Sequence, residues 1–212
     1  QGERVRVLVC RDFASSWLAG QVGTFLVGNP GISVEITAER NGNFRLGEDF
    51  DFRIFYGPER PVVPTGLGQS ELCRWIDMPV CAPGFADHIR EPGELASLPV
   101  LGAAEADRLV HVRLLGPDGR QQEIALEPRL AIDDFVVRNA AVRAGLGFTA
   151  LPSMFCEEEL ARGELVRLLP DWSLPGGYLQ AVYPHRRGLL PAVRVWIDHL
   201  AASFEACGER YV

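Results

Sequence analysis

The fold is decided close to the amino terminus by the stretch RVRVLVCRDFASSWL, residues 4–18. Valines alternate with arginines at its start, and this period of two predicts a β-strand over 4–10. A loop over 11–16 is expected next, and apolar residues at helical spacing then predict a helix over 17–28. Because a strand leads into an amphipathic helix, the chain is expected to begin with a β-α-β unit.

The alternation of strands and helices continues along the chain. Period-two patterns predict strands over 32–38 and 50–57, with a short helix over 43–48 between them. Strands that alternate with helices imply a parallel sheet with crossover connections. A second α/β region is expected to begin with strands over 71–76 and 78–82 and a hairpin of 110–115 with 121–127. A strand over 129–133 then leads into a helix over 134–144, whose inward residues are expected to be Val136, Val137, Ala140 and Ala141. A strand over 147–152 and a helix capped by Ser153 follow. A last helix begins at Pro191 and carries an apolar stripe of Val193, Trp196, Ile197, Leu200 and Phe204.

Composition and charge limit the classes of function. The 212 residues carry a net charge of −7 and contain no basic run, so this stretch is a poor candidate for gripping a nucleic-acid backbone. No apolar run approaches the roughly 20 residues of a membrane-spanning helix, so no membrane contact is expected. The five cysteines are odd in number and widely spaced. This spacing favours small buried thiols in a reducing compartment over a disulfide framework or a metal site.

The sequence contains no recognisable catalytic motif. The GxSxG, HExxH and P-loop patterns do not occur, and the four histidines lie in separate segments. We therefore expect no catalytic residue, no cofactor and no metal ion, and we interpret the chain as a binding module rather than an enzyme.

The first candidate site lies in the expected loop over 11–16. Ligands of open α/β sheets bind beyond the carboxyl ends of the strands. Ser15 and Ser16 stand beside the expected start of the helix, where backbone N–H groups and the helix dipole attract small anions. Arg11 would add positive charge. The alternative is that Ser15 only caps the helix and Arg11 only faces solvent.

The second candidate site is the junction of the strand over 129–133 with the helix over 134–144. Asp133 and Asp134 stand there, and either carboxylate could cap the helix. Equally, the pair could form a cleft wall that accepts hydrogen bonds from a ligand and opposes a purely anionic one. Aromatic side chains at strand ends or in the first loop would either pack in the core or line a cleft for a small organic ligand, and they are Phe13, Phe55, Tyr56 and Phe148.

Six segments follow one another in a recognisable order and cover nearly the whole chain. They are RVRVLVCRDFASSWLAGQVGTFLVGNPGISVEI, DFDFRIFYG, DMPVCAPGFADHI, AIDDFVVRNAAVRAGLGFTALPSMF, LARGELVRLLPDW and LQAVYPHRRGLLPAVRVWIDHLAASF. No single segment is specific, but the ordered set resembles the effector-binding domain of LysR-type transcriptional regulators. The motifs FASSWL and VYPHRR resemble the branch that includes the glycine-cleavage activator.

This resemblance implies an α/β fold of two Rossmann-like subdomains joined by a two-strand hinge, the type 2 periplasmic-binding-protein fold. Subdomain I would contain 1–78 with 184–212, and subdomain II would contain 79–183, so that two separate sheets face one another. A small-molecule effector would bind in the cleft between them. The resemblance also implies a cytoplasmic location and DNA binding through an amino-terminal winged helix-turn-helix outside these residues. It further implies a homodimer that associates through the helices over 17–28 and 134–144, and a tetramer of the full-length protein.

The effector site implied by the resemblance draws on both subdomains. Its residues are Arg11, Asp12, Phe13, Ser15 and Ser16 in the first loop, Arg40, Asn41, Phe55 and Tyr56 on the second wall, and Leu101, Gly102, Asp133, Asp134 and Phe148 in the far lobe. Many relatives carry arginine in place of Phe55 and serine or asparagine in place of Asp134. Both departures make the expected cleft less attractive to an anion, which argues against a plain carboxylate effector.

Two other functions are compatible with an α/β binding fold. A solute-binding protein for transport would have an export signal upstream of Gln1, whereas a regulator would have a helix-turn-helix there. A small α/β enzyme would show turnover, but the absent catalytic set disfavours it. The sequence therefore predicts the effector-sensing domain of a LysR-type regulator, with a periplasmic-type solute-binding protein as the alternative.

Overall fold

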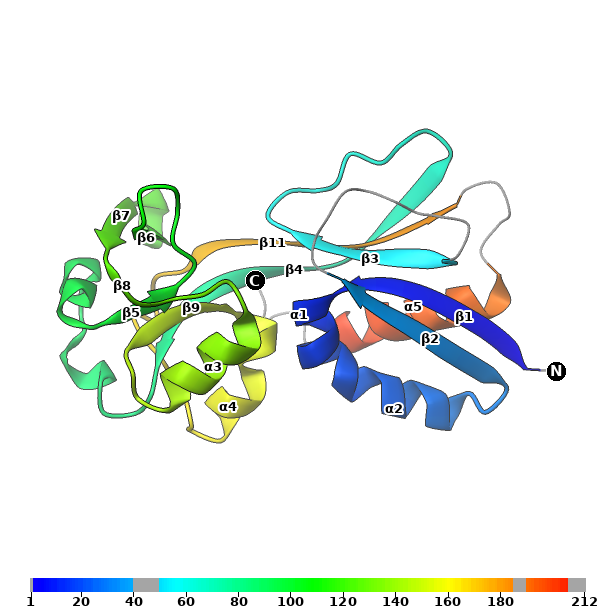
Figure 1. The fold of residues 1–212 in the computed structure, drawn as a ribbon, viewed down its shortest axis with the longest axis horizontal. Helices are drawn as coiled ribbons and strands as arrows, with labels where there is room; N and C mark the ends of the chain where they lie inside the picture. Colours follow the sequence, from blue (N-terminus) through cyan, green and yellow to red (C-terminus); the bar gives the residue numbers. More distant parts are fainter. Residues whose placement is uncertain (1, 40–49, 185–189, 206–212) are drawn as a thin grey trace. The chain divides into compact units, whose positions relative to one another are not determined.

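The computed structural model describes residues 2–39, 50–184 and 190–205. Within these residues, nine strands form one sheet in the order β2-β1-β3-β11-β4-β9-β5-β8, with β10 beside β4, and β6 and β7 form a sheet of their own (Figure 1). The strands are β1 (Glu3–Cys10), β2 (Ile32–Glu39), β3 (Phe52–Gly57), β4 (Leu67–Cys81), β5 (Val100–Gly102), β6 (Val110–Leu115), β7 (Gln121–Leu126), β8 (Pro128–Ala131), β9 (Phe148–Pro152), β10 (Val166–Arg167) and β11 (Leu174–Pro184). The α-helices are α1 (Arg11–Phe13), α2 (Ala19–Gly28), α3 (Phe135–Arg143), α4 (Glu157–Ala161) and α5 (Pro191–Glu205).

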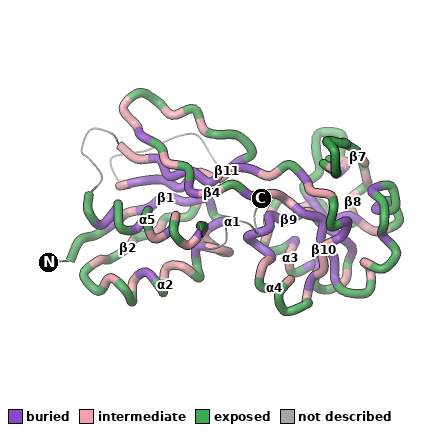
Figure 2. The backbone as a smooth tube through the Cα atoms, turned by 180° about the vertical axis from the view of Figure 1, so that it is seen from behind, coloured by how far each residue is buried: buried purple, intermediate pink, exposed green. Residues whose placement is uncertain are grey.

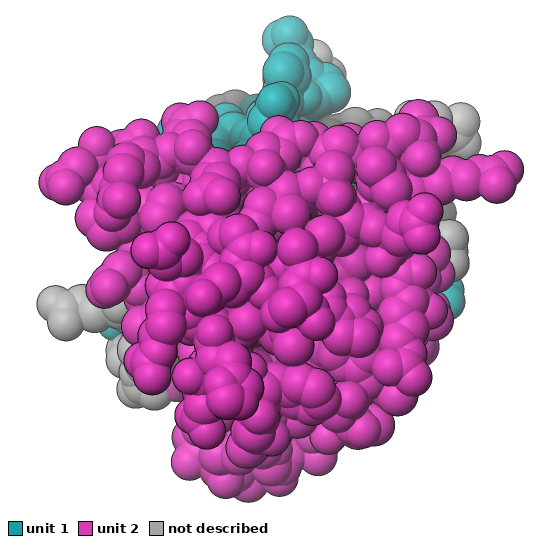
Figure 3. Space-filling view, turned by 90° about the vertical axis from the view of Figure 1, so that its left-hand side faces the viewer, with its two compact units in different colours: residues 1–74, 177–212 teal, residues 75–176 magenta. Residues whose placement is uncertain are grey.

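The chain divides into two compact units. Unit 1 contains Gln1–Arg74 and Gly177–Val212, and unit 2 contains Trp75–Gly176 (Figure 3). Both divisions fall inside strands, β4 and β11, and these two strands are hydrogen-bonded neighbours. The expected boundaries at 78/79 and 183/184 lie within the same two strands. The prediction of two separate sheets was wrong, because the linking strands pair with each other and join the strands of both units into one ladder.

Unit 1 has the predicted parallel β-α-β arrangement. β1 pairs in parallel with β2 and β3, and β11 runs antiparallel beside β3. Val5, Val7 and Val9 are fully buried, as their period-two spacing predicted. α5 packs against β1 and α2, and its predicted stripe from Val193 to Phe204 is buried (Figure 2). Apolar spacing thus located the core of this unit.

The predicted loop over 11–16 is wrong, because the chain enters a helix directly at Arg11. α1, the π-helical segment Ala14–Leu18 and α2 follow one another without a break. Cys10 has extended backbone and is the N-cap, and no described side chain makes a capping bond there. Ser15 therefore lies inside the helical run, and the interpretation of this serine as an N-cap is wrong.

Unit 2 contains the second core. β4 is antiparallel to β9, β5 pairs in parallel with β9 and β8, and α3 packs on β5 and β9. The core includes Val80, Leu95, Leu101, Phe148 and Leu151. The predicted hairpin is confirmed as β6 and β7, paired from Val110 opposite Leu126 to Leu115 opposite Gln121.

The inward face of α3 differs from the prediction. Val136 and Val137 are 52% and 42% exposed, whereas Arg138, Ala141 and Val142 are buried. Arg138 takes an inward position because its guanidinium lies 4.3 Å from the centre of the Phe135 ring and donates to the carbonyl of Ala150 at 3.2 Å. A charged side chain can be buried on these terms, since one of its donors is bonded to a carbonyl and its charge lies on an aromatic face.

Three further expectations changed. The strands predicted over 71–76 and 78–82 are one strand, β4. Ser153 lies in a 3₁₀ turn, Ser153–Phe155, and Cys156 is the N-cap of α4, so Ser153 does not cap that helix. The helix expected over 43–48 lies outside the described residues.

Candidate functional site

Unit 2 contains a pocket of about 240 Å³. Its floor and walls come from strands that end or pass close together, namely β4, β5, β6, β9 and β11, and from α3. Most of the lining is apolar, and the charged or titratable side chains are Asp77, His111, Arg113 and Arg138. A mostly apolar pocket with a few charged groups is the usual form of a small-molecule site, and this volume suits a small metabolite.

Asp77 brings a carboxylate from β4 to the pocket. The indole N–H of Trp75 donates to its Oδ1 at 3.1 Å. Removal from water raises the pKa of the Asp77 carboxyl to about 6, and the attraction of Arg138 and the bond from Trp75 offset this only in part. A carboxylate with such a pKa is stabilised by any further donor or positive charge that enters the pocket.

Arg138 brings a guanidinium to the same pocket from α3. Its position is fixed by the Ala150 carbonyl and the Phe135 ring, and it is 9% exposed. Its charge acts on Asp77, since it lowers the pKa of that carboxyl. The pocket therefore contains one buried cation and one partly buried anion from two different elements.

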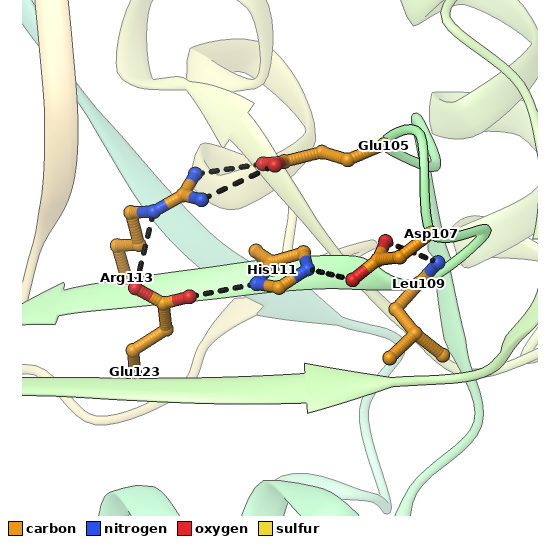
Figure 4. Close-up of polar contacts among 6 residues, drawn as sticks. All are labelled: Glu105, Asp107, Leu109, His111, Arg113 and Glu123. Atoms are coloured by element: carbon orange, nitrogen blue, oxygen red, sulfur yellow. Dashed lines mark hydrogen bonds and ion pairs between the residues drawn. The ribbon is translucent and has the colours of Figure 1, made fainter.

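A polar network on β6 and β7 reaches the edge of the pocket through His111 and Arg113 (Figure 4). The ring nitrogens of His111 lie 2.7 Å from Glu123 Oε1 and 2.8 Å from Asp107 Oδ2. Arg113 joins Glu123 to Glu105, with an Nη1–Oε1 distance of 2.8 Å to the latter. The bonds to Glu123 and then Asp107 raise the pKa of His111, and the same bonds help to lower the pKa of both carboxyls.

The backbone of β5 forms one wall of the pocket. The hydroxyl of Thr149 on β9 donates to the carbonyl of Leu101 at 2.6 Å and ties the two strands together. A Cβ at Gly102 would lie 3.2 Å from Val110 Cγ1, so a larger side chain there would press on β6. Glycine at this position therefore lets Val110 of β6 lie close to the backbone of β5.

The structure brings together three of the residues expected in the far lobe. Leu101, Gly102 and Phe148 line the pocket, whereas Asp133 and Asp134 are not among its lining residues. Asp134 is the N-cap of α3 and accepts from the Val137 N–H at 3.0 Å, so of its two interpretations the structure supports the cap. Asp133 is exposed.

The residues expected in the first loop have separate surroundings in unit 1. Ser16 donates to the carbonyl of Asp12 at 2.6 Å and satisfies an acceptor within the helical run. Phe13 is fully buried and stacks with Phe204 in the core, so its ring offers no surface to a ligand. Arg11 and Ser15 are exposed.

The residues expected on the second wall are only partly described. Phe55 and Tyr56 lie on β3, opposite Gln180 and Leu179 of β11, and both are half-buried. Arg40 and Asn41 lie outside the described residues. The arginine on β3 is Arg53, which is 1% exposed and pairs with Glu39 at 3.3 Å.

Sequence reasoning missed the two charged groups of the pocket, Asp77 and Arg138. Arg138 could have been suspected, because an arginine at that position interrupts the apolar spacing of an amphipathic helix. Asp77 gave no comparable signal, since it stands between two stretches that were interpreted as separate strands.

Other kinds of site find no support in the part of the chain that the structure describes. No group of three or more His, Cys, Asp or Glu side chains there could hold a metal ion. Among the same residues, no helix combines the length and apolarity that crossing a membrane requires.

Solved structures of bacterial regulators share this fold. The regulatory domain of AphB from Vibrio vulnificus superimposes with a TM-score of 0.77 at 22% identity, covering 96% of this chain and 100% of that chain. The regulatory domain of CrgA, a LysR-type transcriptional regulator from Neisseria meningitidis, gives 0.78 at 19% identity, covering 96% and 99%. The predicted class of fold, that of the regulatory domains of LysR-type regulators, is confirmed.

Sequence similarity then gives the family. The model of the LysR substrate binding domain matches residues 1–205, and the chain belongs to that family. It is 30% identical to the HTH-type transcriptional regulator PtxR of Pseudomonas aeruginosa over 94% of this chain and 65% of the relative. It is 26% identical to PerR of Escherichia coli over 91% of this chain and 65% of the relative. The chain thus spans about 65% of the length of these curated relatives.

The predicted branch within the family has weaker support. The glycine cleavage system transcriptional activator of Escherichia coli is 27% identical over 91% of this chain and 63% of the relative. PtxR is more similar than this activator, at 30%. The similarity therefore suggests the glycine-cleavage-activator branch only weakly.

Proposed function

We propose that this chain is the effector-sensing domain of a LysR-type transcriptional regulator whose full-length form binds DNA through an amino-terminal winged helix-turn-helix. The observation that carries the proposal is the family match over residues 1–205. The names of PtxR and PerR as HTH-type regulators, and the 65% of their length that this chain spans, support the extension to DNA binding. The protein then acts in the cytoplasm and catalyses no reaction.

The effector site of this proposal includes the pocket of unit 2. Support comes from its volume, its apolar walls and its two opposite charges at Asp77 and Arg138. An effector that binds one conformation of the domain better than another shifts the population toward it. The strands β4 and β11, which belong to both units, are the connection through which such a shift would pass. The expected contribution of Arg11, Ser15 and Ser16 stays a prediction.

The domain is proposed to form a homodimer through α2 and α3, and the full-length protein is proposed to form a tetramer. Val27 on α2 is 86% exposed, and Val136 and Val137 on α3 are also exposed. Gly20 and Gly23 on α2 have open space around them, which permits the close approach of a second helix. Solvent-facing apolar and small residues on these two helices are suited to association.

Sedimentation of the domain tests the dimer. Val136→Glu is expected to shift the protein toward the monomer, because it places a charge in the proposed contact. Val62→Glu is the matched control, since Val62 is 92% exposed and lies on neither helix. Equal dissociation in both variants, or none in Val136→Glu, would contradict the assignment.

A ligand screen followed by DNA binding tests the function itself. A library of metabolites is added to the domain while its melting temperature is measured, and a ligand at 100 times its dissociation constant should stabilise the fold by about 2.7 kcal/mol. The full-length protein is then expected to change its affinity for DNA fragments selected from genomic DNA by binding to it when that ligand is added. A full-length protein that binds no DNA, or a library without any stabilising compound, would refute the proposal.

A further inference from the structure

We infer that the pocket of unit 2 takes a small aliphatic amine, whose ammonium group binds the carboxylate of Asp77. This inference rests on the proposed function and names the chemical class of its effector. It follows from three properties of the pocket: a carboxylate with few donors, surroundings of net negative charge, and apolar walls around a small volume.

The carboxylate of Asp77 is the anchor for the ammonium group. Among the described residues it accepts one hydrogen bond, from the indole N–H of Trp75 to Oδ1 at 3.1 Å. A carboxylate has two oxygens and room for about four donors, so this bond leaves most of its capacity for a ligand. An ammonium group brings three N–H donors together with a positive charge, and its hydrogen bonds to a carboxylate are among the stronger ones in proteins.

The charge of Asp77 is compensated incompletely even with Arg138 in the same pocket. The guanidinium of Arg138 is engaged by the Ala150 carbonyl and by the Phe135 ring. Removal from water raises the pKa of Asp77 to about 6, and this effect outweighs the attraction of Arg138, which lowers that pKa. A further positive charge beside the carboxylate is therefore favourable.

The charges around the pocket favour a cation over an anion. The network that reaches the pocket through His111 and Arg113 also contains three carboxylates, those of Glu105, Asp107 and Glu123 (Figure 4). With Asp77 and Arg138 included, this group has four carboxylates, two guanidinium groups and one imidazole. Its net charge is negative whether or not the imidazole is protonated. A ligand carboxylate would add to this excess, whereas an ammonium group reduces it.

The walls and the volume set the size of the alkyl group. The walls come from aliphatic and aromatic side chains that include Val100, Leu101, Val112, Phe148 and Leu174. Covering them with an alkyl group is favourable, because it removes apolar surface from water. A volume of about 240 Å³ corresponds to about eight water molecules at ~30 Å³ each, so an amine of about five carbon atoms fits.

Titration calorimetry on the domain tests this inference with three probes that share a branched skeleton of five carbon atoms. Isoamylamine carries the ammonium group, isoamyl alcohol has a neutral donor in its place, and isovalerate has a carboxylate. At pH 7.5 isoamylamine is expected to bind about 10- to 100-fold more tightly than the alcohol, because its hydrogen bond to Asp77 is charge-assisted. Isovalerate is expected to bind more weakly than both.

The pH dependence reports the charge of Asp77. The affinity for isoamylamine should fall about tenfold as pH decreases from about 7.5 to about 5, because protonation of Asp77 removes the charge that holds the ligand. The ammonium group itself stays protonated in this range, as does that of lysine, and so do the guanidinium groups of Arg113 and Arg138. Protonation of His111 acts in the same direction, so Asp77→Asn, which keeps the imidazole, should show a weaker pH dependence.

Variants assign the effect to the pocket. Asp77→Asn keeps the shape of the side chain and one acceptor oxygen. It should weaken isoamylamine about 10- to 100-fold at pH 7.5 and change the affinity for isoamyl alcohol less than about threefold. Retained binding of the alcohol shows that the pocket of the variant is formed. Asp87→Asn is the matched control and should change neither affinity, because Asp87 is exposed and is not among the pocket residues.

The outcomes separate this inference from the proposed function. If isoamylamine gives no heat at millimolar concentration, or binds no more tightly than the alcohol, while another metabolite stabilises the domain, the ligand class is wrong and the proposed function stands. If isoamylamine binds Asp77→Asn as tightly as the wild type, the anchor is wrong. If no metabolite binds and the full-length protein binds no DNA, the proposed function itself fails.

Discussion

Gly147 allows the backbone of β9 to begin directly against Pro99, and its replacement by alanine is the most informative perturbation of unit 2. Its φ is +152°, and a Cβ built there would lie 2.0 Å from the Pro99 carbonyl oxygen. The next residue, Phe148, donates its N–H to that same carbonyl at 2.9 Å. An added methyl group would therefore push away the acceptor that fixes the start of the strand.

The cost follows from these contacts. A non-glycine residue in this backbone region costs about 1–3 kcal/mol. Loss of the Phe148 hydrogen bond adds about 1–2 kcal/mol, since a buried donor is left without its partner. The sum of about 3–5 kcal/mol is a large share of the ~5–15 kcal/mol that stabilises an ordinary domain. For a chain of this length it corresponds to a melting temperature lower by about 6–20 °C.

A series of three glycine-to-alanine variants, followed by calorimetric melting, checks this value. Gly93→Ala is the control, because a Cβ at Gly93 meets nothing within 4 Å, and it should stabilise by about 0.4–1 kcal/mol. Gly145→Ala should cost about 1–2 kcal/mol, since φ is +75° there but the space is open apart from Phe85 at 3.6 Å. If Gly147→Ala melts within 2 °C of Gly145→Ala, the close approach to Pro99 does not limit this position.

Three further predictions concern single polar contacts. Asp134→Ala should lower the free energy of unfolding by about 1 kcal/mol in urea, because the Val137 N–H loses its cap. Asp133→Ala, at the exposed neighbouring position, should change that free energy little, and equal effects of the two variants would contradict the cap. Ser16→Ala should lower the free energy of unfolding by about 1 kcal/mol, because the Asp12 carbonyl loses the hydroxyl that donates to it. Ser15→Ala should lower it by less than about 0.5 kcal/mol, and the reverse order of the two effects would contradict the contact. His111→Gln should change the pH dependence of melting. The pKa of His111 is raised above its ordinary 6.5, so its stabilising contribution is complete below about pH 6.5 and is lost as pH rises through the folded-state pKa. The difference in melting temperature between wild type and variant should therefore shrink as pH rises above about 6.5, and a constant or widening difference would refute the role of the network.

The sequence predicted the parts of the fold that depend on apolar spacing. The buried valines of β1, the stripe of α5 and the hairpin of β6 and β7 were located correctly, since each has a pattern of period two or 3.6 over its own length. The start of the first helix was not, because the pair Ser15-Ser16 has the composition of a cap. In the structure Ser16 instead binds the carbonyl four residues earlier, an alternative that serine always offers.

The candidate site was less predictable than the fold. Leu101, Gly102 and Phe148 could be carried over from the family resemblance, and they do line the pocket of unit 2. Asp77 and Arg138 could not be found, because one lies on a strand and the other on a helix far along the chain, and only the folded backbone brings them together. Local patterns report the secondary structure of each residue and carry no information on such long-range pairs.

The path of the chain between the units determines the order in which the protein can fold during synthesis. Unit 2 is one uninterrupted segment, and the part of β11 that pairs with β3 is made only after that segment. At ~5–20 residues per second, a ribosome needs roughly 5–20 s to add those hundred or so residues. During that interval β3 presents an unpaired edge, the feature of a sheet most prone to wrong pairing. Unit 2, the middle of the chain, can therefore fold before unit 1, whose strands β1, β2 and β3 reach their final state only when β11 arrives.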